Sequence, residues 1–146
     1  MTRIFTIGFT QKSAKQFFSL LQAADVRRVV DTRLNNRSQL AGFSKADDLP
    51  FFLRVIGGID YVHDIRMAPT QEMLDNFKKL KGDWLIYEAE FGDLLRRRNL
   101  AATIAIDDFD RSCLLCSEHE PTHCHRRLVA EYLQAHFPDV RVEHLM

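Results

Sequence analysis

The densest group of reactive side chains in the sequence lies in one short segment towards its end. Cys116 and Glu118 stand two residues apart, and a His-Cys-His-Arg run, His123–Arg126, follows them. A thiolate can act as a nucleophile or a metal ligand, carboxylate and imidazole groups can transfer protons, and a guanidinium can hold an anion. This combination is typical of an active site or a metal centre.

The elements on either side should fix the geometry of this segment. Ser112–Ser117 is a short apolar run, as expected of a strand buried on both faces. Apolar residues at helical spacing follow later, and they predict a helix with Thr122 as its N-cap. His123–His125 would then lie in the first helical turn, where free backbone N–H groups and the helix dipole favour negative charge. We therefore predict a lowered pKa for the Cys124 thiol and a neutral histidine beside it.

Arg126 has two interpretations, and both remain open. A cation near a helix N-terminus is unfavourable unless an anion binds there, and phosphate or a carboxylate is the natural candidate. Alternatively, Arg126 forms an ion pair with Glu118 or Asp31 and holds this part of the chain together.

A metal site is a less favoured alternative. Cys113 and Cys116 are spaced as in a zinc knuckle, but residues three apart in a strand face opposite sides of the sheet. Cys113 is therefore expected in the core. Only one or two of the residues His123, Cys124 and His125 could share an ion with Cys116, because neighbouring residues in a helical turn diverge by about 100°. We predict no cofactor, with zinc or iron as the alternative.

Other polar residues follow the remaining predicted strands. Asp31 and Arg33 come at the end of the second strand, where Asp31 could act as a base and Arg33 could grip an anion, or the two could form a structural salt bridge. His63, with Tyr61 on the same face of the third strand, is either an acid–base group or a strand-end histidine without a catalytic role. Gly8 and Thr10 follow the first strand, at the same edge.

Strands and helices alternate along the chain, which predicts one α/β domain covering residues 1–146. We expect a mostly parallel central sheet of about five strands flanked by helices, in a Rossmann-like three-layer arrangement. In such open sheets ligands bind beyond the carboxyl ends of the strands, so the polar segments should converge on one edge. The expected strands are 3–7, 27–31, 59–63, 112–117 and 140–145, and the expected helices are 13–24, 48–57, 70–82, a long one from 83, a short one near 100–106 and one after 122.

The amino-acid composition limits the classes of binding partner that we expect. The chain of 146 residues has 20 Lys and Arg against 20 Asp and Glu, so no overall charge favours nucleic acid or a membrane. Arg96–Arg98 is either a local basic surface or, more simply, the solvated end of a helix. Three cysteines fit free thiols in a reducing compartment better than a disulfide framework, and no signal peptide or apolar membrane span is evident. We expect a cytoplasmic protein, and the sequence does not indicate its oligomeric state.

Taken together, four motif segments resemble the family called domain of unknown function 488. The segments are Thr6–Thr10, Val30–Arg33, Ile59–His63 and the Cys-x-Glu…Cys-His-Arg pattern of Leu115–Arg126, and they span most of the chain in order. The resemblance implies a compact α/β fold with a site built from these segments. It implies no established reaction, since members of the family are generally labelled uncharacterised.

Two segments depart from the family pattern. Leu34–Ser38 stands where members often have a proline and a Ser-Arg pair, and Asp64–Pro69 replaces the usual loop containing Leu-Gly. Both lie where a substrate would enter, which leaves open whether this chain shares the substrate of typical members.

We predict a small enzyme, of the hydrolase or transferase class, acting on an anionic substrate such as a nucleotide or another phosphorylated metabolite. The alternatives are a non-catalytic module that binds a small anion or, less favoured, nucleic acid, and a metal-binding protein that uses Cys116 with His123, Cys124 and His125. The predicted catalytic residues are Cys116, Glu118, Cys124, His125, Asp31 and His63, and the predicted anion-binding residues are Gly8, Thr10, Arg33, Tyr61 and Arg126.

Overall fold

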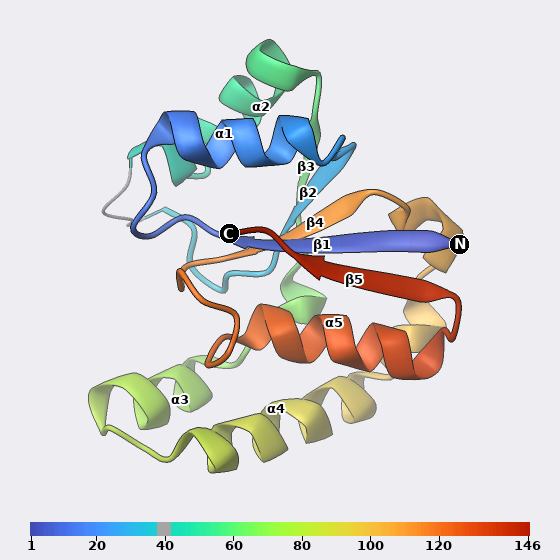
Figure 1. Ribbon diagram of the computed structural model, residues 1–146. Helices are drawn as coiled ribbons and strands as arrows, with labels where there is room; N and C mark the ends of the chain where they lie inside the picture. Colours follow the sequence, from blue (N-terminus) through green and yellow to red (C-terminus); the bar gives the residue numbers. More distant parts are fainter. Residues whose placement is uncertain (38–41) are drawn as a thin grey trace.

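Five parallel strands form the central sheet of the computed structural model, which describes residues 1–37 and 42–146 (Figure 1). Their order is β3-β2-β4-β1-β5, and every neighbouring pair is parallel. This confirms the predicted α/β architecture. The strands are β1 (Thr2–Gly8), β2 (Arg28–Asp31), β3 (Asp60–His63), β4 (Ser112–Cys116) and β5 (Val140–His144).

Helices cover both faces of the sheet and make the outer two of three layers. Helices α1 (Ala14–Ala23) and α2 (Leu49–Gly57) lie on one face, and α3 (Gln71–Leu74), α4 (Trp84–Arg98) and α5 (His125–His136) lie on the other (Figure 1). In the described part of the chain, no helix combines the length and the apolar character needed to cross a membrane.

Local signals start several helices where the sequence predicts. Ser13 and Gln16 form a complete capping box at α1, and the Thr70 side chain accepts a hydrogen bond from the backbone of Met73 at the start of α3. Gly58, with φ of 61°, ends α2. Such caps satisfy backbone groups at helix ends from nearby residues, and they are therefore readable from sequence.

Each face of the sheet has its own apolar core. Ile4 and Leu114 point towards α4 and α5, whereas Phe5 and Leu115 point towards α1 and α2. Strand β4 is buried along its whole length, as its continuous apolar run predicts. Cys113 is fully buried in the second core, and this burial raises the pKa of its thiol, which confirms it as a core residue.

Two helical segments differ from the prediction. The chain after α3 continues as a π-helical turn, Asp75–Lys79, and Gly82 follows closely enough that a Cβ there would lie 2.6 Å from the carbonyl oxygen of Asn76. The short helix expected near 100–106 is instead two 3₁₀ turns, Leu100–Thr103 and Ile106–Phe109.

The start of α5 is a correction that bears on the site. The helix begins at His125 with Cys124 as its N-cap, and Thr122 is not the cap. Cys124 has extended backbone angles, and its N–H donates to the carbonyl of Pro121 at 3.1 Å. His125 therefore lies in the first turn as predicted, whereas His123 and Cys124 belong to the loop before it.

The Arg96–Arg98 triplet ends α4, in agreement with the simpler of its two interpretations. Arg97 pairs with Asp93 one turn earlier, with 2.8 Å between Nε and Oδ2. Arg98 turns inward, and its Nη1 donates to the carbonyls of Arg66 and Ala68 at 2.7 Å each. The triplet fixes the end of a helix and a neighbouring loop.

Candidate functional site

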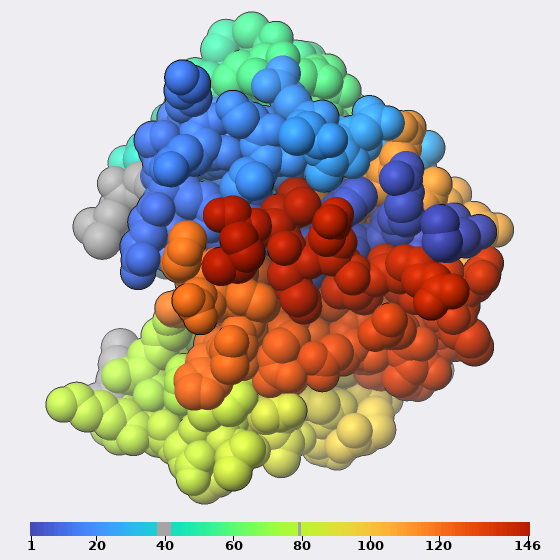
Figure 2. Space-filling model, viewed as in Figure 1, coloured from blue at the N-terminus to red at the C-terminus, as the bar shows by residue number. Residues whose placement is uncertain are grey.

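A cavity of about 280 Å³ lies at the carboxyl ends of β2 and β4. The chain leaves β2 towards α2 on one face of the sheet and leaves β4 towards α5 on the other, which opens a crevice of the kind that holds ligands in α/β folds. In the space-filling view, the loop after β4 (orange) lies at the surface between the N-terminal segment (blue) and the α3–α4 region (yellow-green) (Figure 2).

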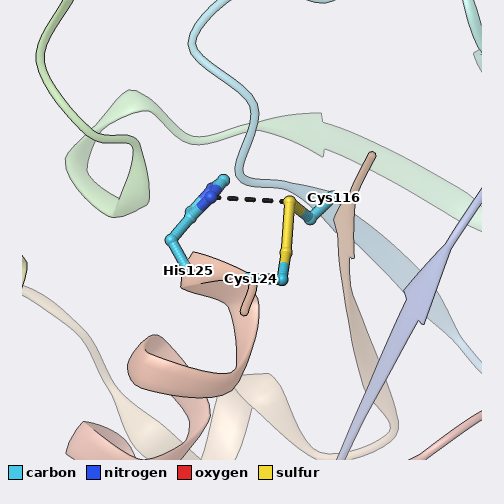
Figure 3. A group of neighbouring side chains, drawn as sticks. All are labelled: Cys116, Cys124 and His125. Carbon is cyan, nitrogen blue, oxygen red and sulfur yellow. Dashed lines mark hydrogen bonds between the residues drawn. A yellow bond between two sulfur atoms is a disulfide. The ribbon is translucent and has the colours of Figure 1, made fainter. Parts of the chain in front are cut away.

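Two cysteines and a histidine gather against this cavity (Figure 3). Cys116 ends β4, Cys124 caps α5 and His125 opens that helix, and all three side chains are buried. The Sγ atoms of Cys116 and Cys124 lie at disulfide distance, and Cys116 Sγ is 3.4 Å from His125 Nδ1. The expectation of three free thiols is therefore wrong for this pair and holds for Cys113.

The hydrogen bonds of His125 fix which ring nitrogen carries the proton. Its Nε2 lies 2.8 Å from the carbonyl oxygen of Thr32 and 3.0 Å from the hydroxyl of Thr32. That hydroxyl already donates its proton to the carbonyl of Leu115, so both neighbours of Nε2 are acceptors and Nε2 must be the donor. The neutral ring then turns the lone pair of Nδ1 towards the sulfur atoms.

Burial lowers the pKa of His125 to about 4, and the positive charges of Lys78 and Arg126 act in the same direction. The imidazole is therefore neutral near pH 7, as predicted. The main cause is the loss of solvent around the ring, whereas the prediction rested on the helix dipole.

Among the His, Cys, Asp and Glu side chains of the described residues, these same three form the group that could hold a metal ion. Their ligand atoms lie within 4.8 Å of one another. His123, part of the alternative metal set in the sequence, is not in this group. Its ring stacks instead on Trp84, with 5.0 Å between centroids and 25° between planes.

Arg126 holds the loop that connects the two cysteines. Its side chain is fully buried, and Nη1 and Nη2 donate to the carbonyls of Glu118 and His119. Burial lowers its pKa to about 10. Among the described residues, neither the Glu118 nor the Asp31 carboxylate pairs with Arg126, which contradicts the ion-pair alternative for this residue. Arg126 does not line the cavity either.

Gly8 and Thr10 complete the support of this loop from the end of β1. Gly8 pairs with Cys116 in the sheet, and a Cβ on Gly8 would lie 1.6 Å from the Glu118 carbonyl oxygen. The hydroxyl of Thr10 donates to the carbonyl of Ser117 at 2.8 Å. Both residues lie under the loop, and neither lines the cavity.

Asp31 is the centre of a buried hydrogen-bond network. Arg33 grips it with two nitrogens, Nε and Nη2, at 2.8 Å each, and the hydroxyl of Tyr61 donates to Oδ2 at 2.6 Å. Asn36 adds a longer contact of 3.5 Å. Burial and the Asp31 carboxylate raise the pKa of Tyr61. Asp31 and Arg33 thus form the structural salt bridge that the sequence left open, and both oxygens of Asp31 are occupied.

Arg33 nevertheless reaches the cavity wall. Its Nη2 also donates to the carbonyl of Ser44 at 2.6 Å, whereas Nη1 is buried without a hydrogen-bond partner. His63 contacts the backbone of this residue, with 2.6 Å between its Nε2 and the Arg33 carbonyl. His63 and Tyr61 line a second hollow beside the main cavity.

Two parts of the cavity wall were not predicted as site residues. Trp84, Phe77 and Tyr87 form an aromatic cluster in which Trp84 and Tyr87 stack at 5.1 Å. Trp84 packs against the core and also lines the cavity. Lys78, from the π-helical turn, lines it as well and pairs with the Glu118 carboxylate at 2.7 Å. Nothing in the local pattern marks Lys78 as a site residue.

A family model matches most of the chain. The model described as "Domain of unknown function DUF488" matches residues 13–133, a range that includes Asp31, Arg33 and the loop between the cysteines but neither β1 nor β5. This match confirms the resemblance to the family, although one of the four motif segments, Thr6–Thr10, lies outside the matched range and the match does not test the Cys-x-Glu…Cys-His-Arg pattern itself. No curated protein and no solved structure matches the chain.

Proposed function

Because this chain belongs to the DUF488 family, whose description names no reaction, we propose its function from the site: it is an enzyme that acts on a small anionic substrate with a planar ring, such as a nucleotide. The observation that carries the proposal is the make-up of one cavity. Its wall combines aromatic rings, the cationic side chains of Arg33 and Lys78, the carboxylates of Asp75 and Glu118, and the Cys116–Cys124–His125 cluster.

The aromatic part of the wall suits a planar ring. Phe77, Trp84 and Tyr87 come from α4 and the turn before it, and His123 extends the same wall through its stack on Trp84. A heterocycle gains apolar contact and favourable ring–ring geometry against such a surface. Pockets for small ligands commonly pair an apolar wall of this kind with a few polar groups that fix orientation.

The cationic part of the wall suits an anion. Arg33 Nη1 is a buried N–H donor with no partner, and an anionic oxygen would remove the cost of leaving it unsatisfied. Lys78 is half exposed, and its partner Glu118 is half exposed too. An anion that takes Lys78 would release the Glu118 carboxylate beside the substrate.

That exchange gives Glu118 a role as general base. A carboxylate next to the reacting group can accept a proton in the transition state, which typically contributes about 10²–10⁴-fold to a rate. The sulfur atoms and the neutral imidazole on the adjoining wall form the reactive centre. In this proposal Arg126, Gly8, Thr10 and Asp31 are positioning residues, since each supports the loop or the cationic wall.

Replacing Lys78 with methionine is expected to weaken substrate binding. The change removes the ammonium group and keeps an apolar stem of similar length, so the dissociation constant of a nucleoside phosphate should rise at least about tenfold. We would measure it by calorimetry with the reduced full-length chain and a panel of nucleotides and other phosphorylated metabolites, and would follow turnover of those that bind.

Lys15→Met is the matched control, because Lys15 is exposed on α1, on the opposite face of the sheet. It should bind the same ligands with unchanged affinity. The proposed function would be wrong if no phosphorylated compound bound more tightly than about 1 mM, or if Lys78→Met and Lys15→Met had equal affinity.

A further inference from the structure

The spacing of the Cys116–Cys124–His125 cluster suits a tetrahedral metal ion. Zinc lies about 2.3 Å from thiolate sulfur and about 2.1 Å from imidazole nitrogen, so a tetrahedral site separates sulfur from nitrogen by roughly 3.6 Å. The observed distance from Cys116 Sγ to His125 Nδ1 is 3.4 Å. All three ligand atoms lie within 4.8 Å of one another, and their side chains are buried.

The imidazole is already oriented as a metal ligand. Since Nε2 donates to the carbonyl of Thr32, the lone pair of Nδ1 faces the two sulfur atoms. Histidines that bind metals usually donate their other ring N–H to a carbonyl or carboxylate in this way. Sulfur atoms joined in a disulfide carry no proton for Nδ1, so the oxidised pair leaves that buried lone pair without a donor, whereas a metal ion would bond to it.

The main chain also leaves room for the sulfur atoms to separate. The Cα atoms of Cys116 and Cys124 are 7.2 Å apart, beyond the range of about 4.4–6.8 Å usual for disulfides. Two thiolates on a tetrahedral zinc ion lie roughly 3.8 Å apart. Cys116 is held by its sheet pairing with Gly8 and Cys124 by the hydrogen bond from its N–H to Pro121, and the distance between their Cα atoms leaves room for this sulfur spacing.

Charge balance favours a divalent ion at this place. Two thiolates and one neutral imidazole around a doubly charged cation have no net charge, which reduces the cost of burying the group. Two sulfur ligands and one nitrogen ligand are typical of zinc, which is softer than magnesium or calcium. The three protein ligands leave the fourth tetrahedral position free, and all three line the cavity.

We infer that the reduced chain binds one zinc ion through Cys116 Sγ, Cys124 Sγ and His125 Nδ1, with the fourth position open to the cavity. Three protein ligands and one open position are the arrangement of catalytic zinc sites, whereas structural sites are closed by four. A water or a substrate oxygen would take the open position and be polarised there. The inferred metal site does not depend on the proposed function. Only the role given to the fourth coordination position rests on that function.

Metal binding is tested on the full-length chain, purified without a histidine tag and reduced under anaerobic conditions. We expect about one equivalent of zinc by elemental analysis. Cobalt substitution should give the intense near-ultraviolet absorption of thiolate-to-cobalt charge transfer together with the visible bands of a tetrahedral ion. Cys116→Ser, Cys124→Ser and His125→Ala should each weaken zinc binding at least about 100-fold.

Cys113→Ala and His136→Ala are the matched controls, since Cys113 lies in the core and His136 is exposed on α5. Both should retain about one equivalent of zinc. The inference is overturned if the reduced, unaltered chain holds less than about a tenth of an equivalent and cobalt gives no charge-transfer band. It is equally overturned if the controls lose the metal as the ligand variants do.

The unaltered chain decides the question even where a ligand variant fails to fold, because elemental analysis and the cobalt spectrum need no substitution. The measurement also separates the two proposals, since it needs no substrate. A chain that binds zinc but no phosphorylated compound would keep the metal site and remove the proposed function. A chain that binds such compounds through Lys78 but binds no metal would keep the proposed function and remove the metal site.

Discussion

Glu118→Gln is expected to lower kcat on the substrate by at least about 100-fold while leaving the fold unchanged. Glutamine has the same shape and can still accept a hydrogen bond from Lys78, but its amide cannot take up a proton at neutral pH. Glu118 is half exposed on a loop, so little packing changes with the substitution. The test is the turnover of a compound found in the binding screen. Circular dichroism of the variant checks that its fold is unchanged.

The two kinetic parameters, kcat and KM, should respond differently to substitution of Lys78 and of Glu118. Lys78→Met removes binding of the anion in the ground state and should raise KM. Glu118→Gln removes a proton acceptor used in the transition state, and it also weakens the attraction that holds Lys78 away from the substrate, so KM should fall or stay constant while kcat drops. A substitution that only disturbed the loop would change both parameters in the unfavourable direction.

Glu120→Gln is the control for the loss of one negative charge. Glu120 lies on the same loop, is exposed and does not line the main cavity. Its kcat should stay within about twofold of the unaltered chain. A kcat for Glu118→Gln within about threefold of the unaltered value would remove Glu118 from the chemistry.

The sequence predicts the sheet edge of the site because the signals that define it are local. The buried run of β4, the capping box of Ser13 and Gln16, and the glycine that ends α2 each act through residues a few positions away. Once strands alternate with helices, their carboxyl ends must meet at one edge of a parallel sheet. The placement of Cys116 and Arg33 at that edge follows from this rule alone.

The roles of individual residues depend on contacts between distant segments, which no local pattern reveals. Asp31 looks like a free base at a strand end, yet Tyr61 from β3 donates to its Oδ2, and Asn36 from the loop after β2 contacts the same oxygen. Trp84 has the helical spacing of a core residue, and only the path of the loop before α5 brings His123 onto it. Arg126 likewise bonds to the carbonyls of Glu118 and His119 in the loop before α5, a contact that no local pattern indicates.

Gly8→Ala is expected to destabilise the chain by about 3 kcal/mol and to abolish turnover. A Cβ at this position would lie 1.6 Å from the Glu118 carbonyl oxygen and 3.0 Å from Arg126 Nη1. The nearer atom belongs to the backbone, so a rotamer change cannot relieve the overlap. Either β1 must shift against β4 or the loop that carries Glu118 must lift away from it.

Gly92→Ala is the control, and it is expected to change the free energy of unfolding in the opposite direction. Gly92 lies inside α4, and a Cβ there meets only the flexible end of Arg96 at 3.5 Å. Alanine in a helix interior is more stable than glycine by up to about 1 kcal/mol, so this variant should unfold at slightly higher urea concentration. Urea unfolding under reducing conditions measures both variants on one scale.

The origin of the Gly8→Ala effect can be tested with a double variant. If the added methyl group acts by lifting the loop, it breaks the bonds from Arg126 to the Glu118 and His119 carbonyls and leaves a buried guanidinium unpaired. Arg126→Met removes those bonds in advance. The loss in the double variant should therefore be smaller than the sum of the two single losses by at least about 1 kcal/mol. Additive losses of unfolding free energy would show that β1 shifts and the loop does not move. Glu118 would then keep its place beside the cavity.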